Sequence, residues 1–300
     1  MTTYSAFLTC LLIIVPTLVK AEVKATSADY QNQVITIALT QEPPQLNSMK
    51  ATDQVSAMVL GHINQGLVRY DRRGQVVPGV AERWEITDEG ATFWLRENAT
   101  WSDGKPVTSH DFKFAWGNAL LPETASQYAF IFYPIKNAKE INEGTLSVDT
   151  LGVEAVSDRI LKVTFERPTG YFIKLTSFVT YYPVRQDFFE MKGSRYGANA
   201  DDLLYNGAFK MTEWKHSASL KMVKNEHYWD RENISLNEIN AEYITADTRS
   251  RLNLYIDGKI VFTRLDGETY KDALSQRFRI RRFTTGSVFY LEYNHRPQRP

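Results

Sequence analysis

Apolar and polar positions follow both strand-like and helix-like spacings along this chain. Residues 34–39 are a short run of apolar and β-branched side chains, which predicts a buried strand. The strand should end before Pro43 and Pro44, because proline cannot donate to a sheet. Residues 54–67 then carry apolar side chains at helical spacing: Val55, Met58, Val59, Ile63 and Leu67.

Two β-hairpins are predicted next. Their turns are residues 71–74 and 87–90, each ending in glycine. The paired strands are residues 67–70 with 75–77, and 84–86 with 92–96. Within the last strand Phe93 and Leu95 share one face, because side chains alternate along a strand.

A longer helix follows a third turn at residues 101–106. Thr108 or Ser109 can cap its start, and Pro122 ends it. The apolar stripe predicted to be buried is Phe112, Ala115, Trp116, Ala119 and Leu120.

Strands and helices are mixed in the remainder. Residues 160–165 alternate as a strand, and residues 288–293 form a final strand. A hairpin is expected from residues 209–214 and 219–223, and a helix from Asp247 through residue 255. Interleaved elements of both kinds predict a mixed α/β fold.

The N-terminus is interpreted as a secretion signal. Residues 7–19 are almost continuously apolar but fall short of the ~20 residues that a membrane span needs. Cleavage is expected after Ala21. Thr9 before Cys10 argues against lipidation. A short membrane anchor or a misplaced start stays open, because residues 1–5 contain no Lys or Arg.

Charge and cysteine content exclude several classes of protein. Cys10 is the only cysteine, so the mature chain would have no disulfide, thiolate metal site or cysteine nucleophile. Lys20 is the only charged residue in the leader; without it 34 basic residues face 35 acidic ones, a formal charge of −1. This balance does not favour nucleic-acid binding.

Catalytic motifs give little support to an enzyme. The five histidines have no H-E-x-x-H spacing, and no G-x-S-x-G, phosphate-binding loop or dinucleotide fingerprint occurs. Two converging carboxylates, as in a glycoside or peptide hydrolase, stay open. The prediction is a non-enzyme without cofactors or metal.

A block of motifs from residue 66 to 116 carries a resemblance to a known family. It contains Ala81-Glu82-Arg83-Trp84 and Trp101-Ser102-Asp103-Gly104. Other segments at compatible spacing are residues 45–47, 124–129, 206–210, 224–225 and 228–230. Together they resemble bacterial extracellular solute-binding proteins of family 5, specifically the periplasmic oligopeptide-binding proteins of ABC importers.

The resemblance implies a fold of the periplasmic-binding-protein type II-like class. The predicted first lobe is a mixed sheet built from residues 22–64 and 186–294. A small α+β lobe, residues 65–185, is inserted in it. Residues 1–21 are the signal peptide, and residues 295–300 begin the crossover to an opposing C-terminal lobe that the prediction gives as absent.

The resemblance also implies a function. The expected protein is a monomer in the periplasm of a Gram-negative bacterium, capturing oligopeptides and delivering them to an inner-membrane ABC permease. Because ligands are normally enclosed between two lobes, weak binding or none is expected from one lobe alone. A binder of another solute (murein peptide, dipeptide, heme or nickel chelate) and a nonfunctional remnant remain alternatives.

By family position, Thr52, Asp53 and Gln54 should face the peptide backbone. A solvated turn and helix cap is an equal alternative, since Thr and Asp favour caps. Tyr128 matches a tyrosine that reaches the peptide, and a half-buried packing role is its alternative.

Three further residues are candidates by the same resemblance. Tyr290 and Glu292 lie two apart on the predicted final strand and therefore share a face. A face covered by the opposing lobe is their alternative reading. Arg264 stands at a cleft position and would prefer an acidic peptide group, although an ordinary surface arginine is favoured.

Aromatic residues in the motif block invite comparison with sugar-stacking platforms. Their spacing favours core and turn packing instead. The residues concerned are Trp84, Phe93, Trp94, Trp101, Phe112 and Trp116.

Overall fold

The computed structural model describes residues 27–282, so the predicted leader and the predicted strand 288–293 lie outside it. Its helices are α1 (Gln54–Ile63), α2 (Ser109–Leu120), α3 (Ala138–Asn142), α4 (Phe172–Leu175), α5 (Gln186–Lys192), α6 (Thr248–Ile256) and α7 (Gly267–Ser275). Its strands are β1 (Ala28–Asp29), β2 (Val34–Leu39), β3 (Val68–Tyr70), β4 (Val76–Pro78), β5 (Ala81–Ile86), β6 (Gly90–Leu95), β7 (Val153–Ser157), β8 (Ile160–Thr164), β9 (Phe209–Lys215), β10 (Ser219–Lys224) and β11 (Glu238–Ile244).

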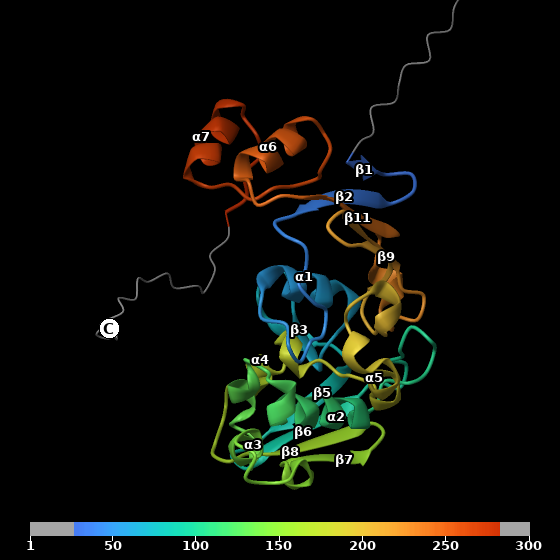
Figure 1. The fold of residues 1–300 in the computed structure, drawn as a ribbon, viewed down its shortest axis with the longest axis vertical. Coiled ribbons are helices and arrows are strands. Elements are labelled where there is room, and N and C mark those ends of the chain that lie inside the picture. The colour runs from blue at the N-terminus through green and yellow to red at the C-terminus, as the bar shows by residue number, and fades with distance from the viewer. Residues whose placement is uncertain (1–26, 283–300) are drawn as a thin grey trace, which may run out of the picture.

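A five-stranded sheet joins the start of the described chain to residues beyond 208. Its order is β1-β2-β11-β10-β9. β2 and β11 run parallel, and the other neighbours are antiparallel. Figure 1 shows this sheet between α1 on one side and α6 with α7 on the other. The predicted strand at 34–39 and the predicted hairpin of β9 and β10 are confirmed.

Helix α1 buries the apolar face that its spacing predicts. Val55, Val59 and Ile63 are buried in a cluster with Ile37 and Ile239 of the sheet, which we call the five-strand core. The helix ends at Ile63 and does not reach Leu67. Its backbone is already extended at residue 64, and Leu67 is buried in a different cluster.

The second sheet is antiparallel, with the order β5-β6-β8-β7. It lies at the far end of the molecule, covered by α2 (Figure 1). The predicted turns at residues 71–74 and 87–90 connect β3 to β4 and β5 to β6. Gly74 has φ of +72°, a conformation that favours glycine in this turn.

Aromatic side chains dominate the centre of this second unit, which we call the four-strand core. The whole predicted stripe of α2 is fully buried, and the Trp116 ring meets Phe132 and Tyr181 at centroid distances of 6.1 and 5.0 Å. The prediction of core packing is confirmed for Phe93, Trp101, Phe112 and Trp116. Trp84 is partly buried and packs against this core beside its cross-strand partner Phe93, whereas Trp94 lies with Arg83 on the other face of β5 and β6.

The two cores meet where Asn206 clamps the chain leaving α1. The Asn206 Oδ1 accepts hydrogen bonds from Asn64 Nδ2 at 3.1 Å and from the Gln65 N–H at 3.0 Å. Its Nδ2 donates to the Gln65 carbonyl at 2.9 Å. The predicted lobe boundary at residues 64 and 65 stays a prediction, and this separation of cores supports it.

Helices α6 and α7 pack on each other beyond β2. The predicted start of α6 is confirmed, since the Asp247 carboxylate accepts from the Ser250 N–H. Among residues 27–282, no helix is long and apolar enough to cross a bilayer.

Asp111 in the first turn of α2 is a buried carboxyl. Its Oδ2 accepts from Trp101 Nε1 at 3.0 Å and from the Thr108 N–H at 2.8 Å. Burial raises the pKa of Asp111 to about 6, although both hydrogen bonds act in the opposite direction. The folded state therefore retains a proton that the unfolded chain has already released between about pH 4 and pH 6.

We expect Asp111→Asn to stabilise the protein above pH 6. The amide oxygen can accept both hydrogen bonds without a buried charge, so the gain at pH 7.5 should be about 2 kcal/mol and should vanish near pH 4. Urea unfolding at four pH values measures it, with the exposed Asp88→Asn as the control for losing one charge. Equal pH slopes in wild type and Asp111→Asn would contradict this prediction.

Candidate functional site

The segment of residues 52–54 caps a helix, as one alternative predicts, and also presents unpaired groups that a ligand could contact. The Asp53 carboxylate caps α1, accepting from the Val55 and Ser56 N–H groups at 3.0 and 2.8 Å. Thr52 and Gln54 are exposed. Within residues 27–282 their side chains make no hydrogen bond, nor do the backbone N–H groups of residues 52–54. These groups are free to pair with a ligand main chain.

Tyr128 is partly buried and lies beside two exposed phenylalanine rings. Its ring meets Phe178 edge-on, with centroids 5.1 Å apart and planes at 80°, and Phe130 at 6.0 Å. Phe130 and Phe178 are 56% and 40% exposed, although phenylalanine is usually buried. The Tyr128 hydroxyl has no hydrogen-bond partner in the part of the chain that the structure describes. We call these three residues the aromatic patch.

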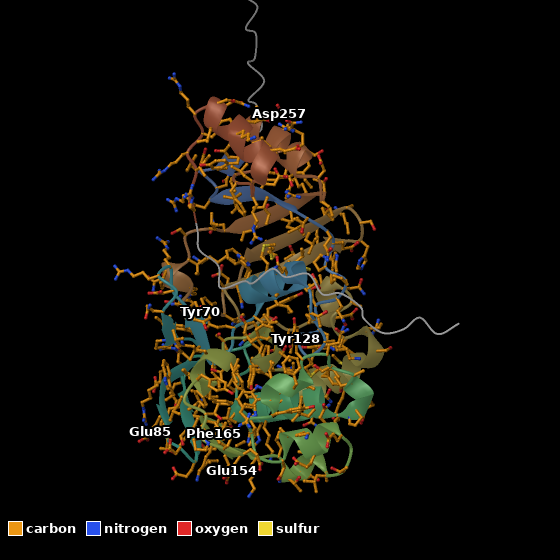
Figure 2. The ribbon with its side chains drawn as sticks, turned by 90° about the vertical axis from the view of Figure 1, so that its left-hand side faces the viewer. Tyr70, Glu85, Tyr128, Glu154, Phe165 and Asp257 are labelled. Carbon is orange, nitrogen blue, oxygen red and sulfur yellow. The ribbon has the colours of Figure 1, made fainter. Side chains whose placement is uncertain are left out.

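The structure brings the aromatic patch and the 52–54 segment onto neighbouring loops. Ser126 Oγ donates to the Met49 carbonyl at 2.6 Å. Val179, next to Phe178, is buried in the five-strand core with Ala51 and Val55. Figure 2 shows Tyr128 at mid-height, close to the level of α1. Two predicted contact regions about 75 residues apart in sequence therefore lie on loops that are neighbours in space.

The other predicted residues are not joined to these loops. Arg264 is exposed, and its guanidinium has no partner among the described residues. Its segment runs beside β2, where the Val261 N–H donates to the Thr36 carbonyl. Tyr290 and Glu292 lie outside the described residues and stay predictions.

Sequence reasoning missed Phe130 and Phe178. Phe130 is the second residue of the 3₁₀ turn Ala129–Phe132, whose Ala129 and Phe132 are buried, so a burial pattern could have marked it as outward-facing. Phe178 sits on a segment 50 residues away, and no spacing rule connects it to Tyr128.

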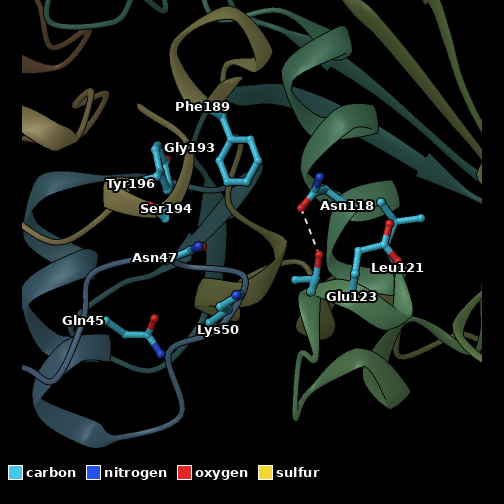
Figure 3. Close-up of a pocket in the computed structure, with 11 residues that line it drawn as sticks. Gln45, Asn47, Lys50, Asn118, Leu121, Glu123, Phe189, Gly193, Ser194 and Tyr196 are labelled. Atoms are coloured by element: carbon cyan, nitrogen blue, oxygen red, sulfur yellow. Dashed lines mark hydrogen bonds between the residues drawn. The ribbon is translucent and has the colours of Figure 1, made fainter. Parts of the chain in front are cut away.

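A cavity of about 330 Å³ lies beside the loop that leads into α1 (Figure 3). It separates the loop before α1 from the end of α2 and the segment after α5. Sequence reasoning did not identify it, although residues 45–47 were part of the family resemblance. Its lining is Gln45, Asn47, Lys50, Asn118, Leu121, Glu123, Thr124, Phe189, Gly193, Ser194 and Tyr196.

The largest pKa shifts fall on buried tyrosines, among them Tyr196 of the cavity lining, whose pKa burial raises above its usual value. Burial raises the pKa of Tyr182 to about 12 and that of Tyr181 well above its usual value. The Tyr181 hydroxyl donates to the Ile131 carbonyl inside the four-strand core. Within residues 27–282, no three His, Cys, Asp or Glu side chains converge as a metal site.

Comparison with known proteins identifies the family of this chain. The sequence profile of the bacterial extracellular solute-binding proteins, family 5 Middle, matches residues 75–300. The chain belongs to this family. The predicted family and the mixed α/β fold are thereby confirmed.

Proteins named as peptide binders are among the relatives. The oligopeptide-binding protein OppA of Bacillus subtilis is 41% identical over 208 residues, which are 68% of this chain and 38% of that protein. The periplasmic murein peptide-binding protein MppA of Escherichia coli is 30% identical over 266 residues, 87% of this chain and 49% of its own.

A solved structure of Listeria monocytogenes OppA bound to peptide superposes with a TM-score of 0.78 at 34% identity. The match covers 82% of this chain and 49% of that one. The chain thus spans between 38 and 49% of the length of these three proteins. The family is one of solute-binding proteins, and its relatives here are periplasmic or extracellular binders.

Proposed function

We propose that this chain is part of the solute-binding component of an ABC importer and captures oligopeptides for an inner-membrane permease. The observation that carries the proposal is that residues 52–54 and the aromatic patch lie on neighbouring loops. We propose a monomeric, non-catalytic protein in the periplasm of a Gram-negative bacterium, exported by a leader cleaved after Ala21.

Recognition would depend mainly on the peptide main chain. Unpaired backbone N–H groups at residues 52–54 can pair with peptide carbonyls, which gives affinity without reading side chains. The Tyr128 hydroxyl adds one polar contact, and its ring offers an apolar face. Arg264, Tyr290 and Glu292 are proposed as further contacts from the rest of the first lobe.

The two lobes of this chain would together contact one side of the bound peptide. We propose that residues 22–64 and 186–294 form the first lobe and residues 65–185 the inserted lobe. The two separate cores and the Asn206 clamp between them support this division. An opposing lobe that closes over the peptide would exclude water and strengthen each polar contact.

The proposal predicts that Tyr128→Ala weakens peptide binding about tenfold, a loss of ~1.4 kcal/mol, because the hydroxyl and the ring both leave the surface. Isothermal titration calorimetry with a pool of tri- to pentapeptides measures this. Tyr70→Ala is the matched control, since Tyr70 is 50% exposed on β3, away from Tyr128 in Figure 2. Equal affinities for the two variants would refute the role of Tyr128.

The murein peptide alternative keeps support from the name of one relative, MppA. The same titration with murein peptides decides between the two solutes. Stronger heat from murein peptides than from the oligopeptide pool would favour the alternative. Hydrolysis of a chromogenic peptide by the purified chain would contradict both binding functions.

A further inference from the structure

The cavity of Figure 3 is large enough for a small polar ligand. Its volume of about 330 Å³ lies at the lower end of the range for ligand pockets, roughly 300–1,000 Å³. Asn47 and Lys50 stand on one side, Asn118 and Leu121 on the other, with Phe189 between them in Figure 3. None of these residues belongs to the surface of residues 52–54 and the aromatic patch.

Asn47 supplies an unpaired donor in this cavity. The residue is only 6% exposed, and its Oδ1 accepts from the Met49 N–H at 3.1 Å. Because that backbone group can only donate, the facing atom must be oxygen, which fixes the amide orientation. The Asn47 Nδ2 therefore points elsewhere, and it has no partner within residues 27–282. That nitrogen keeps contact with solvent, so a ligand in the cavity can reach it.

Lys50 adds a positive charge on the same side of the cavity. Its ammonium has no ion pair or hydrogen bond with any residue that the structure describes. A carboxylate placed here would accept from Asn47 and Lys50 together, and hydrogen bonds to charged groups are the stronger kind.

The opposite side of the cavity is negative. Glu123 lines it just beyond the C-terminal end of α2, and this carboxylate also has no ion pair in the described chain. The C-terminal end of a helix favours cations, so it reinforces the preference for an ammonium group. Phe189 and Tyr196 form an apolar wall, with ring centroids 5.0 Å apart.

We propose that this cavity binds a free α-amino acid with an apolar side chain, separately from the peptide surface. The carboxylate of the ligand accepts from Asn47 and Lys50, and its ammonium faces Glu123. Its side chain packs against Phe189 and Tyr196. The opposed charges of the lining select a zwitterion over a simple anion or amine.

Ligand-observed NMR and calorimetry on the purified chain test this site. The probes are phenylalanine, phenylalaninamide, which lacks the carboxylate, and phenylpropionate, which lacks the ammonium. Phenylalanine should bind at least tenfold more tightly than either analogue.

Variants locate the binding. Asn47→Asp keeps the acceptor for the Met49 N–H but replaces the free donor with a carboxylate oxygen, so phenylalanine affinity should fall at least tenfold. The exposed Asn98→Asp makes the same charge change at a site outside the cavity lining and should leave affinity unchanged. Lys50→Glu should also lower affinity tenfold, and this exposed residue is replaced without disturbing the core.

Absence of phenylalanine binding at 10 mM, or affinity unchanged in both Asn47→Asp and Lys50→Glu, overturns the proposal. The outcome is independent of the peptide function, because Tyr128→Ala is expected to leave phenylalanine binding intact. A chain that does not bind oligopeptides can therefore still bind phenylalanine in this cavity, and a chain that does not bind phenylalanine can still bind oligopeptides.

Discussion

Replacing Trp116 by alanine is expected to lower the free energy of unfolding by about 4 kcal/mol, within the usual range for a buried tryptophan. The indole is fully buried and makes ring contacts with Phe112, Phe132, Phe172 and Tyr181. Its Nε1 donates to the Tyr181 carbonyl at 2.9 Å. Alanine would therefore leave both a cavity and a buried carbonyl without its partner. Urea unfolding followed by circular dichroism measures the loss.

Two variants control for the mechanism of this loss. Trp116→Phe keeps an aromatic ring but removes the Nε1 donor, so it should cost about 2 kcal/mol. Trp94→Ala removes a partly buried indole that lies over Arg83, 3.5 Å from the guanidinium carbon to the ring centroid. If Trp116→Ala destabilises the protein no more than Trp94→Ala, the four-strand core is not organised around Trp116.

Gly207→Ala should destabilise the protein by about 3 kcal/mol, the upper part of the range for overpacking. A Cβ at Gly207 would lie 2.6 Å from the Asn64 nitrogen and 2.6 Å from the Ile63 carbonyl carbon. The Gly207 N–H donates to the Ile63 carbonyl at 3.0 Å, so the two backbones are already in direct contact. Neither can yield without breaking the junction between the two cores.

Gly61→Ala is the matched control for this substitution. Gly61 lies within α1, and a Cβ there meets nothing within 4 Å. Alanine is favoured over glycine in a helix by about 1 kcal/mol, so this variant should be slightly more stable than wild type. Thermal melts of both variants decide the matter. If Gly207→Ala has the same melting temperature as Gly61→Ala, the backbones at the junction between the two cores are not tightly packed.

Local patterns were enough to predict the elements with strong periodicity. The strand at residues 34–39, the buried stripe of α2 and the hairpin of β9 and β10 each bury the side chains that their spacing selects. The α2 prediction was the most complete, because a capping position, an apolar stripe and a terminating proline agree along one segment.

Other elements could not be recognised as readily. Helix α7 has only Thr269 and Ala273 buried, so its apolar face is too narrow for a clear helical period. β11 alternates between partly buried and buried positions at its start, but only over four residues. Its parallel pairing with β2, about 200 residues away, follows from tertiary packing and has no local signature.

Some features of the candidate site can also be predicted from local sequence, whereas others arise only from the fold. The resemblance located Tyr128 and residues 52–54, and the Asp53 cap is visible from residue type alone. The contact of Tyr128 with Phe178 and the cavity beside Asn47 arise from segments 50 to 150 residues apart. That the Tyr128 hydroxyl and the Asn47 amide have no partner follows only from the hydrogen bonds of the whole fold.

The central claim is that residues 52–54 and the aromatic patch form one peptide-binding surface. Amide chemical-shift mapping of the isotope-labelled chain during titration with tri- to pentapeptides tests it most directly, because the method detects weak binding. The claim predicts concentration-dependent shifts at residues 52–54, 126–130 and 178. Shifts confined to other regions, or none at millimolar peptide, would contradict it.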